Sequence, residues 1–469
     1  MTAQHRVDAP ADDGVAPRLR VLLSRWPQKV EAPLVETPAS WRGVLWTTYI
    51  ATMYYLMSNP LVFVPAIEVS ILFASWATIL LLVVERRRVR LPVVPWSVLL
   101  LLVLMAVSMA WSISKDDTWA MTRLMVVIAA LALLVTSNVS AKVLAYGMGL
   151  GGAAIMCLSM LAFWLELPGS IMPFDIIPTV AGVGTNRNIL AYSLVPALGA
   201  VLTIRPTARW EWPVAAILAA ANAWGIWVST SGTGYLAGGL VVLAAIGLRL
   251  AVVARRVAGR WSTAVILAVM AAGAVAAAAN LGLLARIVGR DLETLSGRRP
   301  LWSAIVDVSD DQLLQGYGFG AVWNHPWHSV DPNPVLTDLY LKAAYPYAHG
   351  HNSFMDLLPE LGLLGCAVLV LIYLQTLGRA VRAMLTIITP ASLEASGLII
   401  LVCLGHLASG LSEPLATVPF GWYVLVLAAG ISLQLGSGRL RQSPAQDVDG
   451  AADVEPPRPR EAAAATRPG

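Results

Sequence analysis

The sequence is poor in charge and in cysteine, and each shortage excludes a class of protein. Charged residues make up 13% of the 469 residues, whereas average globular proteins carry about 25%. The three cysteines, Cys157, Cys366 and Cys403, all lie in apolar runs. They form no C-x-x-C pair, so neither a disulfide framework nor a cysteine-based metal site is expected.

What the sequence has instead is hydrophobic length. Hydrophobic residues make up 57% of the chain, and the mean hydropathy is +0.68. Several apolar runs reach about 18 residues, the length that crosses the hydrocarbon core of a bilayer. The composition therefore predicts an all-α, polytopic integral membrane protein.

Polar residues divide the apolar sequence into about twelve transmembrane helices and one large outer loop. The predicted spans are 43–58, 61–84, 92–111, 119–136, 143–167, 189–204, 212–229, 234–254, 262–284, 352–377, 395–411 and 415–436. Together they form a transmembrane domain over 43–437, which includes the extracytoplasmic loop 285–351. No internal repeat is found.

The short basic connections predict the orientation. "ERRRVR" at 85–90, "RPTAR" at 205–209, "RRVAGR" at 255–260 and "GRAVR" at 378–382 all fall on the side of the N-terminal tail. Because short cytoplasmic loops are enriched in arginine and lysine, we expect that side to be the cytoplasm.

Both tails are then cytoplasmic. The N-terminal tail, 1–42, lacks the pattern of a cleavable signal peptide. The C-terminal tail, 438–469, is rich in Pro, Ala and acids, and we expect it to be disordered.

The loop 285–351 is unusually long, and such loops are commonly functional. In "LSGRRPLWSAIVDV", Pro300 suits the first position of a helix. The following apolar residues predict a helix that lies against the membrane face: Leu301, Trp302, Ile305, Val306 and Val308. Arg298 and Arg299 would stand at its N-terminus.

Two further helix starts face the same outer side. In "GVGTNRNILAY", Asn188 is a candidate N-cap, with Arg187 just before it. In "HGHNSF", Asn352 or Ser353 can cap the helix, with His351 beside its first turn.

These residues suit a diphosphate site with a base beside it. Helix N-termini attract anions, and arginine forks bind phosphate. The positive end of a helix dipole favours the neutral imidazole of His351, which can accept a proton as a general base. An arginine at a membrane surface can also be an interfacial residue that reaches towards water.

Four of the six histidines lie between positions 325 and 351: His325, His328, His349 and His351. Zinc needs three or four convergent ligands, but Pro326 and Trp327 separate the first pair and the nearby acids are scattered. We therefore expect no metal and interpret His349 as a supporting residue. His406, inside a predicted span, is expected to pack against a polar group.

Four short blocks between about 180 and 365 resemble the O-antigen ligase and polymerase superfamily. They are "GVGTNRNILAYSL", "LSGRRPLW", "GYGFG" and "HNSFMDLLPELGLLG". The resemblance implies transfer of a glycan from a polyprenyl-diphosphate carrier to an acceptor hydroxyl, on the outer face of the bacterial inner membrane. It also implies an inverting reaction that needs neither a metal nor a cofactor.

The resemblance further implies roles for individual residues. Arg298 would bind the diphosphate, His351 would activate the acceptor, and Arg187 would be a second phosphate ligand. Three more residues are expected at the substrate or in support of it: Arg299, Asn352 and Asn188. Many relatives carry a Ser-Arg pair where this chain has Ser231 followed by Gly232.

Other functions stay open. Twelve spans also fit a secondary transporter or exporter of envelope precursors, although repeated halves and ionisable residues at the membrane midplane are not evident. A non-catalytic scaffold is a third possibility. The sequence does not separate polymerase from ligase, and the acceptor could be a glycan, a lipid or a protein. No nucleic-acid partner is expected.

Overall fold

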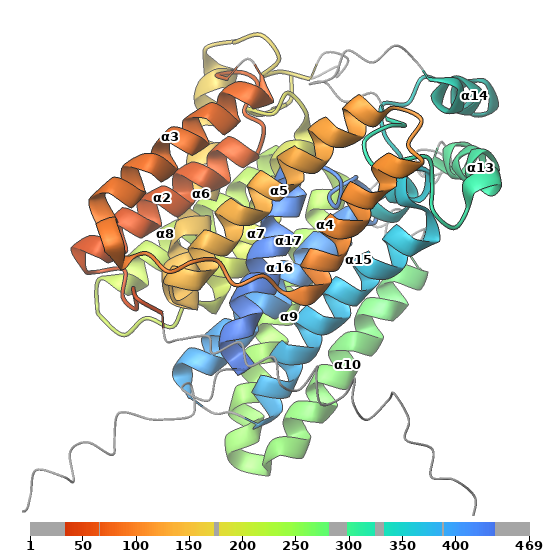
Figure 1. The fold of residues 1–469 in the computed structure, drawn as a ribbon. Coiled ribbons are helices and arrows are strands. Elements are labelled where there is room, and N and C mark those ends of the chain that lie inside the picture. Colours follow the sequence, from red (N-terminus) through yellow and green to blue (C-terminus); the bar gives the residue numbers. More distant parts are fainter. Residues whose placement is uncertain are drawn as a thin grey trace, which may run out of the picture.

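The structure is a computed structural model that describes residues 33–64, 66–172, 178–280, 298–323, 333–386 and 389–436. In these ranges it is helical and contains no β-strand (Figure 1). The α-helices are α2 Trp41–Met57, α3 Ile67–Glu85, α4 Trp96–Val107, α5 Lys115–Asn138, α6 Ala141–Trp164, α7 Arg187–Thr203, α8 Glu211–Val228, α9 Gly232–Ala258, α10 Arg260–Ala279, α13 Arg298–Ser309, α14 Pro334–Ala343, α15 Ser353–Thr386, α16 Pro390–Gly410 and α17 Pro419–Ser432. Short 3-10 helices are η1 Arg86–Arg88, η2 Ser108–Ala110, η3 Asp310–Gln312 and η4 Leu433–Gly436.

Each predicted span contains an α-helix, so the predicted all-helical class is confirmed for the described residues. Six helices are long and apolar enough to cross a membrane: α3, α5, α6, α9, α15 and α16. Several of the others, such as α4 and α17, are apolar but shorter. The protein is therefore a helical membrane protein, while the count of twelve crossings stays a prediction.

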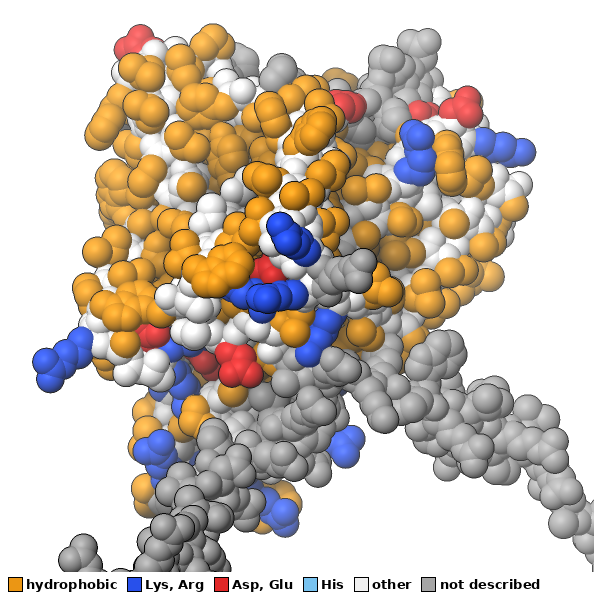
Figure 2. Space-filling model, turned by 60° about the vertical axis from the view of Figure 1, so that its left-hand side comes forward, with side chains coloured by type: hydrophobic (Ala, Val, Ile, Leu, Met, Phe, Trp, Pro, Cys, Tyr) orange, Lys and Arg blue, Asp and Glu red, His pale blue; other side chains and the backbone are white. Residues whose placement is uncertain are grey.

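The outside of the bundle is hydrophobic. On α3 the side chains of Leu72, Phe73, Trp76 and Leu80 are each more than half exposed. Hydrophobic side chains cover much of the face drawn in Figure 2. A soluble protein rarely exposes an apolar surface of this extent, whereas a lipid-facing surface requires it.

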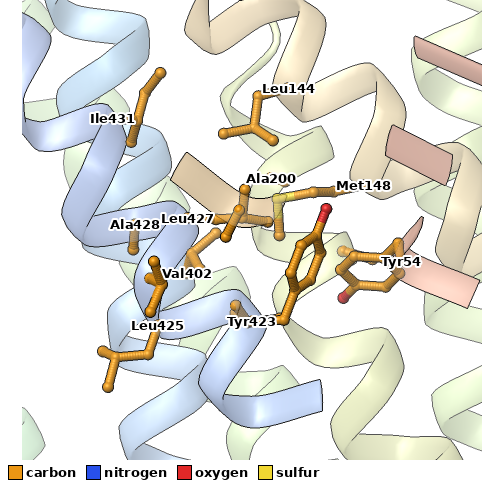
Figure 3. Close-up of a cluster of buried hydrophobic side chains, with 14 of the residues drawn as sticks. Tyr54, Leu144, Met148, Ala200, Val402, Tyr423, Leu425, Leu427, Ala428 and Ile431 are labelled. Carbon is orange, nitrogen blue, oxygen red and sulfur yellow. The ribbon is translucent and has the colours of Figure 1, made fainter. Parts of the chain in front are cut away.

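The centre of the bundle is formed by α7, α16 and α17, in which most residues are buried. A helix that is apolar all round suits such a position. Figure 3 shows the packing of Tyr54, Met148, Val402 and Tyr423 in this core.

The ends of the helices form two groups. In one group Arg42 makes a 2.6 Å ion pair with Glu85, and Lys142 makes one of 2.7 Å with Glu211. Arg255 donates to the carbonyl of Leu385 at the end of α15 (3.1 Å). The basic connections of the sequence therefore share one end of the bundle, as the predicted orientation requires.

The helix α13 differs from its prediction. It includes Arg298 and Arg299, so that Pro300 is its third residue and not its first. Leu301 and Ile305 are fully buried against α14 and α15, while Val306 is 45% exposed. The apolar face thus packs on protein and not on the membrane surface, because α14, which the sequence interpretation missed, supplies a partner.

Parts of several predictions lie outside the described residues. They are most of each tail, the loop segments 281–297 and 324–332, and with them His325 and His328.

The helix α15 covers the predicted span 352–377, and it contains a break that the sequence interpretation did not predict. Its backbone breaks at Gly362, where φ is 62° and ψ is −162°. Four backbone hydrogen bonds join the break to the segment 313–318: Leu363 N to Leu313 O (2.9 Å), Leu364 N to Leu314 O (3.1 Å), Tyr317 N to Pro359 O (2.8 Å) and Gly318 N to Glu360 O (2.9 Å). The blocks "GYGFG" and "LPELGLLG" therefore interlock, and each satisfies backbone groups that the other leaves unpaired.

Candidate functional site

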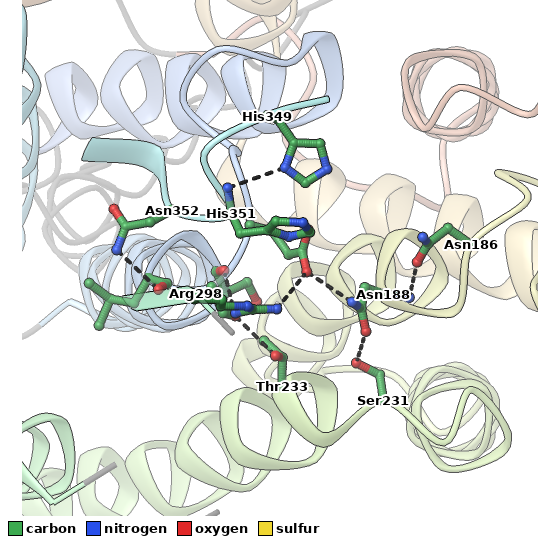
Figure 4. Close-up of polar contacts among 12 residues, drawn as sticks. Asn186, Asn188, Ser231, Thr233, Arg298, His349, His351 and Asn352 are labelled. Carbon is green, nitrogen blue, oxygen red and sulfur yellow. Dashed lines mark hydrogen bonds and ion pairs between the residues drawn. The ribbon is translucent and has the colours of Figure 1, made fainter. Parts of the chain in front are cut away.

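A buried carboxylate, Glu413, forms the centre of the polar cluster at the other end of the bundle. It lies between α16 and α17 and is 4% exposed. Asn188 Nδ2 donates to its Oε1 at 2.9 Å, and Arg298 Nη2 lies 3.6 Å from the same oxygen. His351 Nδ1 lies 3.8 Å from Oε2. Figure 4 shows Asn188, Arg298 and His351 directed towards one another.

The backbone around Glu413 is held in place, so its side chain has a fixed origin. Its N–H donates to the carbonyl of Ser409 at 3.0 Å. Its own carbonyl accepts from Ser353 Oγ at 3.2 Å, in the first turn of α15. This second contact ties the backbone of Glu413 directly to the helix that follows His351.

At the start of α7 the predicted cap is wrong by two residues. Asn186 is the N-cap, because its side chain accepts from the N–H of Asn188 at 2.8 Å. Asn188 lies in the first turn instead, where its amide bridges Glu413 and Ser231, whose Oγ donates to Asn188 Oδ1 at 2.8 Å. The sequence offers an asparagine at both positions, and only the start of the helix decides between them.

Ser231 also explains the local sequence "STSG". Its Oγ accepts from the N–H of Gly234 (3.2 Å) and so caps α9. Gly232 is the first residue of α9. At the start of α9 the site therefore has an uncharged contact between Ser231 and Asn188. Many members of the family that the sequence resembles carry an arginine after this serine, where this chain has Gly232.

The two other arginines have different surroundings. Arg187 is half-buried as the first residue of α7, directly before Asn188. Arg299 is exposed on α13, unlike its neighbour Arg298. The structure thus brings Arg298 into the cluster and turns Arg299 to the surface.

His351 has an unusual backbone conformation. Its φ is 48°, a left-handed conformation that costs a non-glycine residue about 1 kcal/mol or more. The preceding residue is fixed on both sides: Gly350 N donates to Asp356 Oδ1 (2.7 Å), and its carbonyl accepts from Trp302 Nε1 of α13 (2.9 Å). Strained backbone that is held in this way is typical of functional sites.

Asn352 and Ser353 were the two predicted caps of the following helix, and in the structure the cap is Asn352. Its Oδ1 accepts from Phe354 N (2.8 Å) and Met355 N (3.3 Å). Its Nδ2 donates to the carbonyl of Leu411, two residues before Glu413 (3.1 Å). Asn352 therefore orients the start of α15 relative to the connection that carries Glu413.

Two buried carboxylates were missed by the sequence interpretation. Glu413 lies in the short segment "LSEP", between the last two predicted spans. Asp356, 1% exposed, accepts from Gly350 N and from the Thr417 hydroxyl. No local pattern identifies either residue, because their partners are far away in the sequence.

His349 supports the turn around His351. Its Nδ1 accepts from the N–H of His351 at 3.2 Å, and the two rings are 4.0 Å apart. His349, His351 and Glu413 also offer ligand atoms that lie within 4.8 Å of one another, so these three residues could hold a metal ion. The Arg298 guanidinium, however, already places a positive charge beside the carboxylate.

Aromatic rings lead from the surface to His351. Tyr345 is 59% exposed, and its ring lies 4.7 Å from that of Tyr347. The ring of Tyr347 in turn lies 6.1 Å from that of His351, edge to face.

His406 lies away from this cluster and is buried. Its Nδ1 is 2.6 Å from the Tyr373 hydroxyl, and its Nε2 is 2.8 Å from the Gly421 carbonyl. These contacts confirm the prediction that His406 packs against a polar group.

The described residues thus define a helical membrane protein with a polar, partly buried cluster at one end. The cluster combines an arginine, an imidazole and a carboxylate beside the starts of α7, α13 and α15. Such a cluster can bind an anion and accept a proton.

No family model matches the chain. Over 250 residues it is 26% identical to the exopolysaccharide production protein ExoQ of Rhizobium meliloti (strain 1021). The aligned region covers 51% of this chain and 55% of that protein, so the chain spans about half the length of the curated relative it matches.

Proposed function

We propose that the protein transfers a glycan from a polyprenyl-diphosphate-linked donor to an acceptor hydroxyl during the assembly of an envelope polysaccharide. The observation that carries the proposal is the convergence of Arg298, His351 and Asn188 on the buried Glu413. The similarity to an exopolysaccharide production protein supports a role in the assembly of an envelope polysaccharide.

The donor diphosphate would lie near Arg298 and Arg187, at the starts of α13 and α7. Helix starts carry unpaired N–H groups and a partial positive charge, and arginine adds a charged fork. These groups would neutralise the charge that develops on the diphosphate as it leaves. They replace a divalent cation in this role, which is why the proposed reaction is independent of metal.

His351 would act as the general base. Its Nδ1 faces Glu413, so that Nε2 is left for the acceptor hydroxyl. The imidazole takes the proton of the hydroxyl while its oxygen attacks the anomeric carbon from the face opposite the diphosphate. The bond between that carbon and the diphosphate oxygen breaks, its electrons stay with the diphosphate, and the anomeric configuration is inverted.

Glu413 is a positioning residue in this account. A carboxylate that faces one nitrogen of an imidazole orients the ring and stabilises the imidazolium formed after proton transfer. The present distance of 3.8 Å is longer than a hydrogen bond, and such contacts often tighten only when the substrate is bound.

The acceptor would approach along the aromatic row of Tyr345 and Tyr347. Flat ring faces provide apolar contact area for a sugar next to the base.

The site would open on the outer face of the bacterial inner membrane. Both termini would lie in the cytoplasm, and the polyprenyl chain of the donor would lie in the bilayer.

The test is to incubate the purified protein with a polyprenyl-diphosphate-linked glycan in EDTA and to analyse the products by mass spectrometry. We expect a longer carrier-bound ladder for a polymerase, or one transferred block for a ligase. The variant Arg298→Lys should be slower by at least about tenfold because it loses the guanidinium fork, while Arg299→Lys, on the exposed neighbour, serves as the control. Loss of transfer in EDTA that a divalent metal restores would instead assign His349, His351 and Glu413 to a metal. No consumption of the donor under any condition would contradict the proposal.

A further inference from the structure

A groove lies at the end of the bundle opposite the candidate site. It is lined by the end of α7 and the following residues, by α9 and α16, and by the end of α15. Its lining is divided in chemistry: Arg205 and Arg249 are cationic, whereas Leu202, Leu248 and Val252 are apolar.

The cationic part carries more positive than negative charge. Arg205 lies within electrostatic range of Arg249 and Arg256 and of one carboxylate, Glu394. Burial lowers the pKa of the half-buried Arg205 guanidinium; Glu394 opposes this shift and the two neighbouring arginines add to it. Three positive charges therefore face one negative charge, and a bound anion would relieve their mutual repulsion.

The arginines are held at the edge of the groove. Arg249 Nη2 donates to the carbonyl of Leu202 at 3.2 Å, which ties α9 to the end of α7. The backbone N–H of Arg205 donates to Glu394 Oε1 at 3.1 Å, so the carboxylate contacts the main chain of Arg205. Within the described part of the chain, no residue accepts a hydrogen bond from the guanidinium of Arg205, so its donors can bind another acceptor.

The apolar part continues towards the hydrophobic surface of the bundle. Leu248 is buried and Val252 half-buried in the groove, while Leu250 and Val253 on the same helix are more than half exposed. An occupant that fits both parts needs an anionic group at one end and a hydrocarbon chain at the other. Basic pockets between membrane helices bind anionic lipid head groups for this reason.

We propose that this groove binds an anionic phospholipid, with its phosphate between Arg205 and Arg249 and one acyl chain along Leu248 and Val252. The site is separate from the Glu413 cluster and does not depend on the proposed transfer reaction. The feature that selects a lipid over free phosphate is the apolar wall beside the arginines.

The experiment measures retention of phosphatidylglycerol by the full-length protein, with native mass spectrometry and with phosphatidylcholine as the neutral comparison. Removing both charges with Arg205→Gln and Arg249→Gln should weaken phosphatidylglycerol binding about 30-fold, since one arginine near a lipid head group contributes about 1 kcal/mol. Arg88→Gln is the matched control, because Arg88 is an exposed arginine of η1 at the same end. It should bind as the wild type does.

A second variant, Val252→Trp, fills the apolar wall and keeps every charge. It should also weaken phosphatidylglycerol retention, while the melting temperature shows that the protein is folded. Equal retention of phosphatidylglycerol and phosphatidylcholine by the wild type would overturn the proposal. So would displacement of the lipid by millimolar inorganic phosphate, or binding unchanged in both the double variant and Val252→Trp.

Discussion

At the scale of single residues, Glu413 connects three side chains that are far apart in the sequence. Asn188, Arg298 and His351 come from the starts of α7 and α13 and from the turn before α15. A carboxylate that is 4% exposed must be compensated by donors or positive charge. The partners of Glu413 are the groups that the proposed reaction uses, so Glu413 fixes the positions of these groups relative to one another.

Glu413→Gln removes the negative charge and keeps the size of the side chain. We expect kcat to fall about 10- to 100-fold, as for other residues that orient a reacting group, with a smaller change in the KM for the donor. The control is Glu68→Gln, since Glu68 is an exposed carboxylate in the first turn of α3.

A double-mutant cycle separates positioning from general damage. If Glu413 acts through His351, the variant His351→Ala with Glu413→Gln should be as slow as His351→Ala alone. Additive losses in the double variant would show that Glu413 acts elsewhere.

The sequence predicted the residues of this site whose position follows from local patterns. His351 and Asn352 stand before an apolar run, and Arg298 stands at the start of a helix, so both placements could be inferred. The roles of Glu413 and Asp356 could not be inferred, because a carboxylate in a short connection or inside a helix gains its role only from distant contacts. The prediction of the N-cap of α7 was wrong for a simpler reason: Asn186 and Asn188 are both asparagines, and asparagine is a good cap at either position.

At the scale of elements, the break in α15 shows how two glycine-containing blocks depend on each other. Gly362 and Gly316 both have positive φ. A Cβ at Gly316 would lie 2.3 Å from the Glu360 carbonyl carbon, and one at Gly362 would lie 2.4 Å from the Leu314 carbonyl carbon. Sequence periodicity locates an apolar run but does not reveal such a break, since apolar residues continue on both sides of Gly362.

Gly362→Ala should destabilise the protein by about 2 kcal/mol or more, because it adds strain at positive φ and a clash with the facing backbone. Gly378→Ala is the control in the same helix: nothing lies within 4 Å of its added Cβ, and alanine is the better helix former by up to about 1 kcal/mol. Thermal unfolding in detergent measures both. Equal melting temperatures would mean that the break is not a rigid feature of the fold.

At the scale of the whole molecule, the two ends of the bundle differ in chemistry. One end holds the basic connections and ion pairs such as Lys142–Glu211, and the other holds the Glu413 cluster. The alternating path of the helices follows from the apolar runs and short connections, which the sequence shows clearly. The positions of α13 and α14 do not follow from the apolar runs, since they depend on how the two helices pack on α15.

The proposed orientation predicts which end is accessible from outside the cell. In a Cys157→Ser background, which removes the exposed native thiol, Glu68→Cys and Arg299→Cys should react with a membrane-impermeant maleimide on intact spheroplasts. Arg88→Cys and Arg209→Cys, at the basic end, should react only after permeabilisation. The reverse pattern would place the candidate site in the cytoplasm, where the proposed reaction does not occur.

The most direct test of the proposed function is the initial rate of glycan transfer by His351→Ala, measured with purified protein and a polyprenyl-diphosphate-linked donor. Loss of a general base should lower this rate about 10²- to 10⁴-fold, while donor binding is retained and His349→Ala loses much less. A His351→Ala protein that is folded and transfers glycan at the wild-type rate would contradict the role of His351 as the base and, with it, the proposed mechanism.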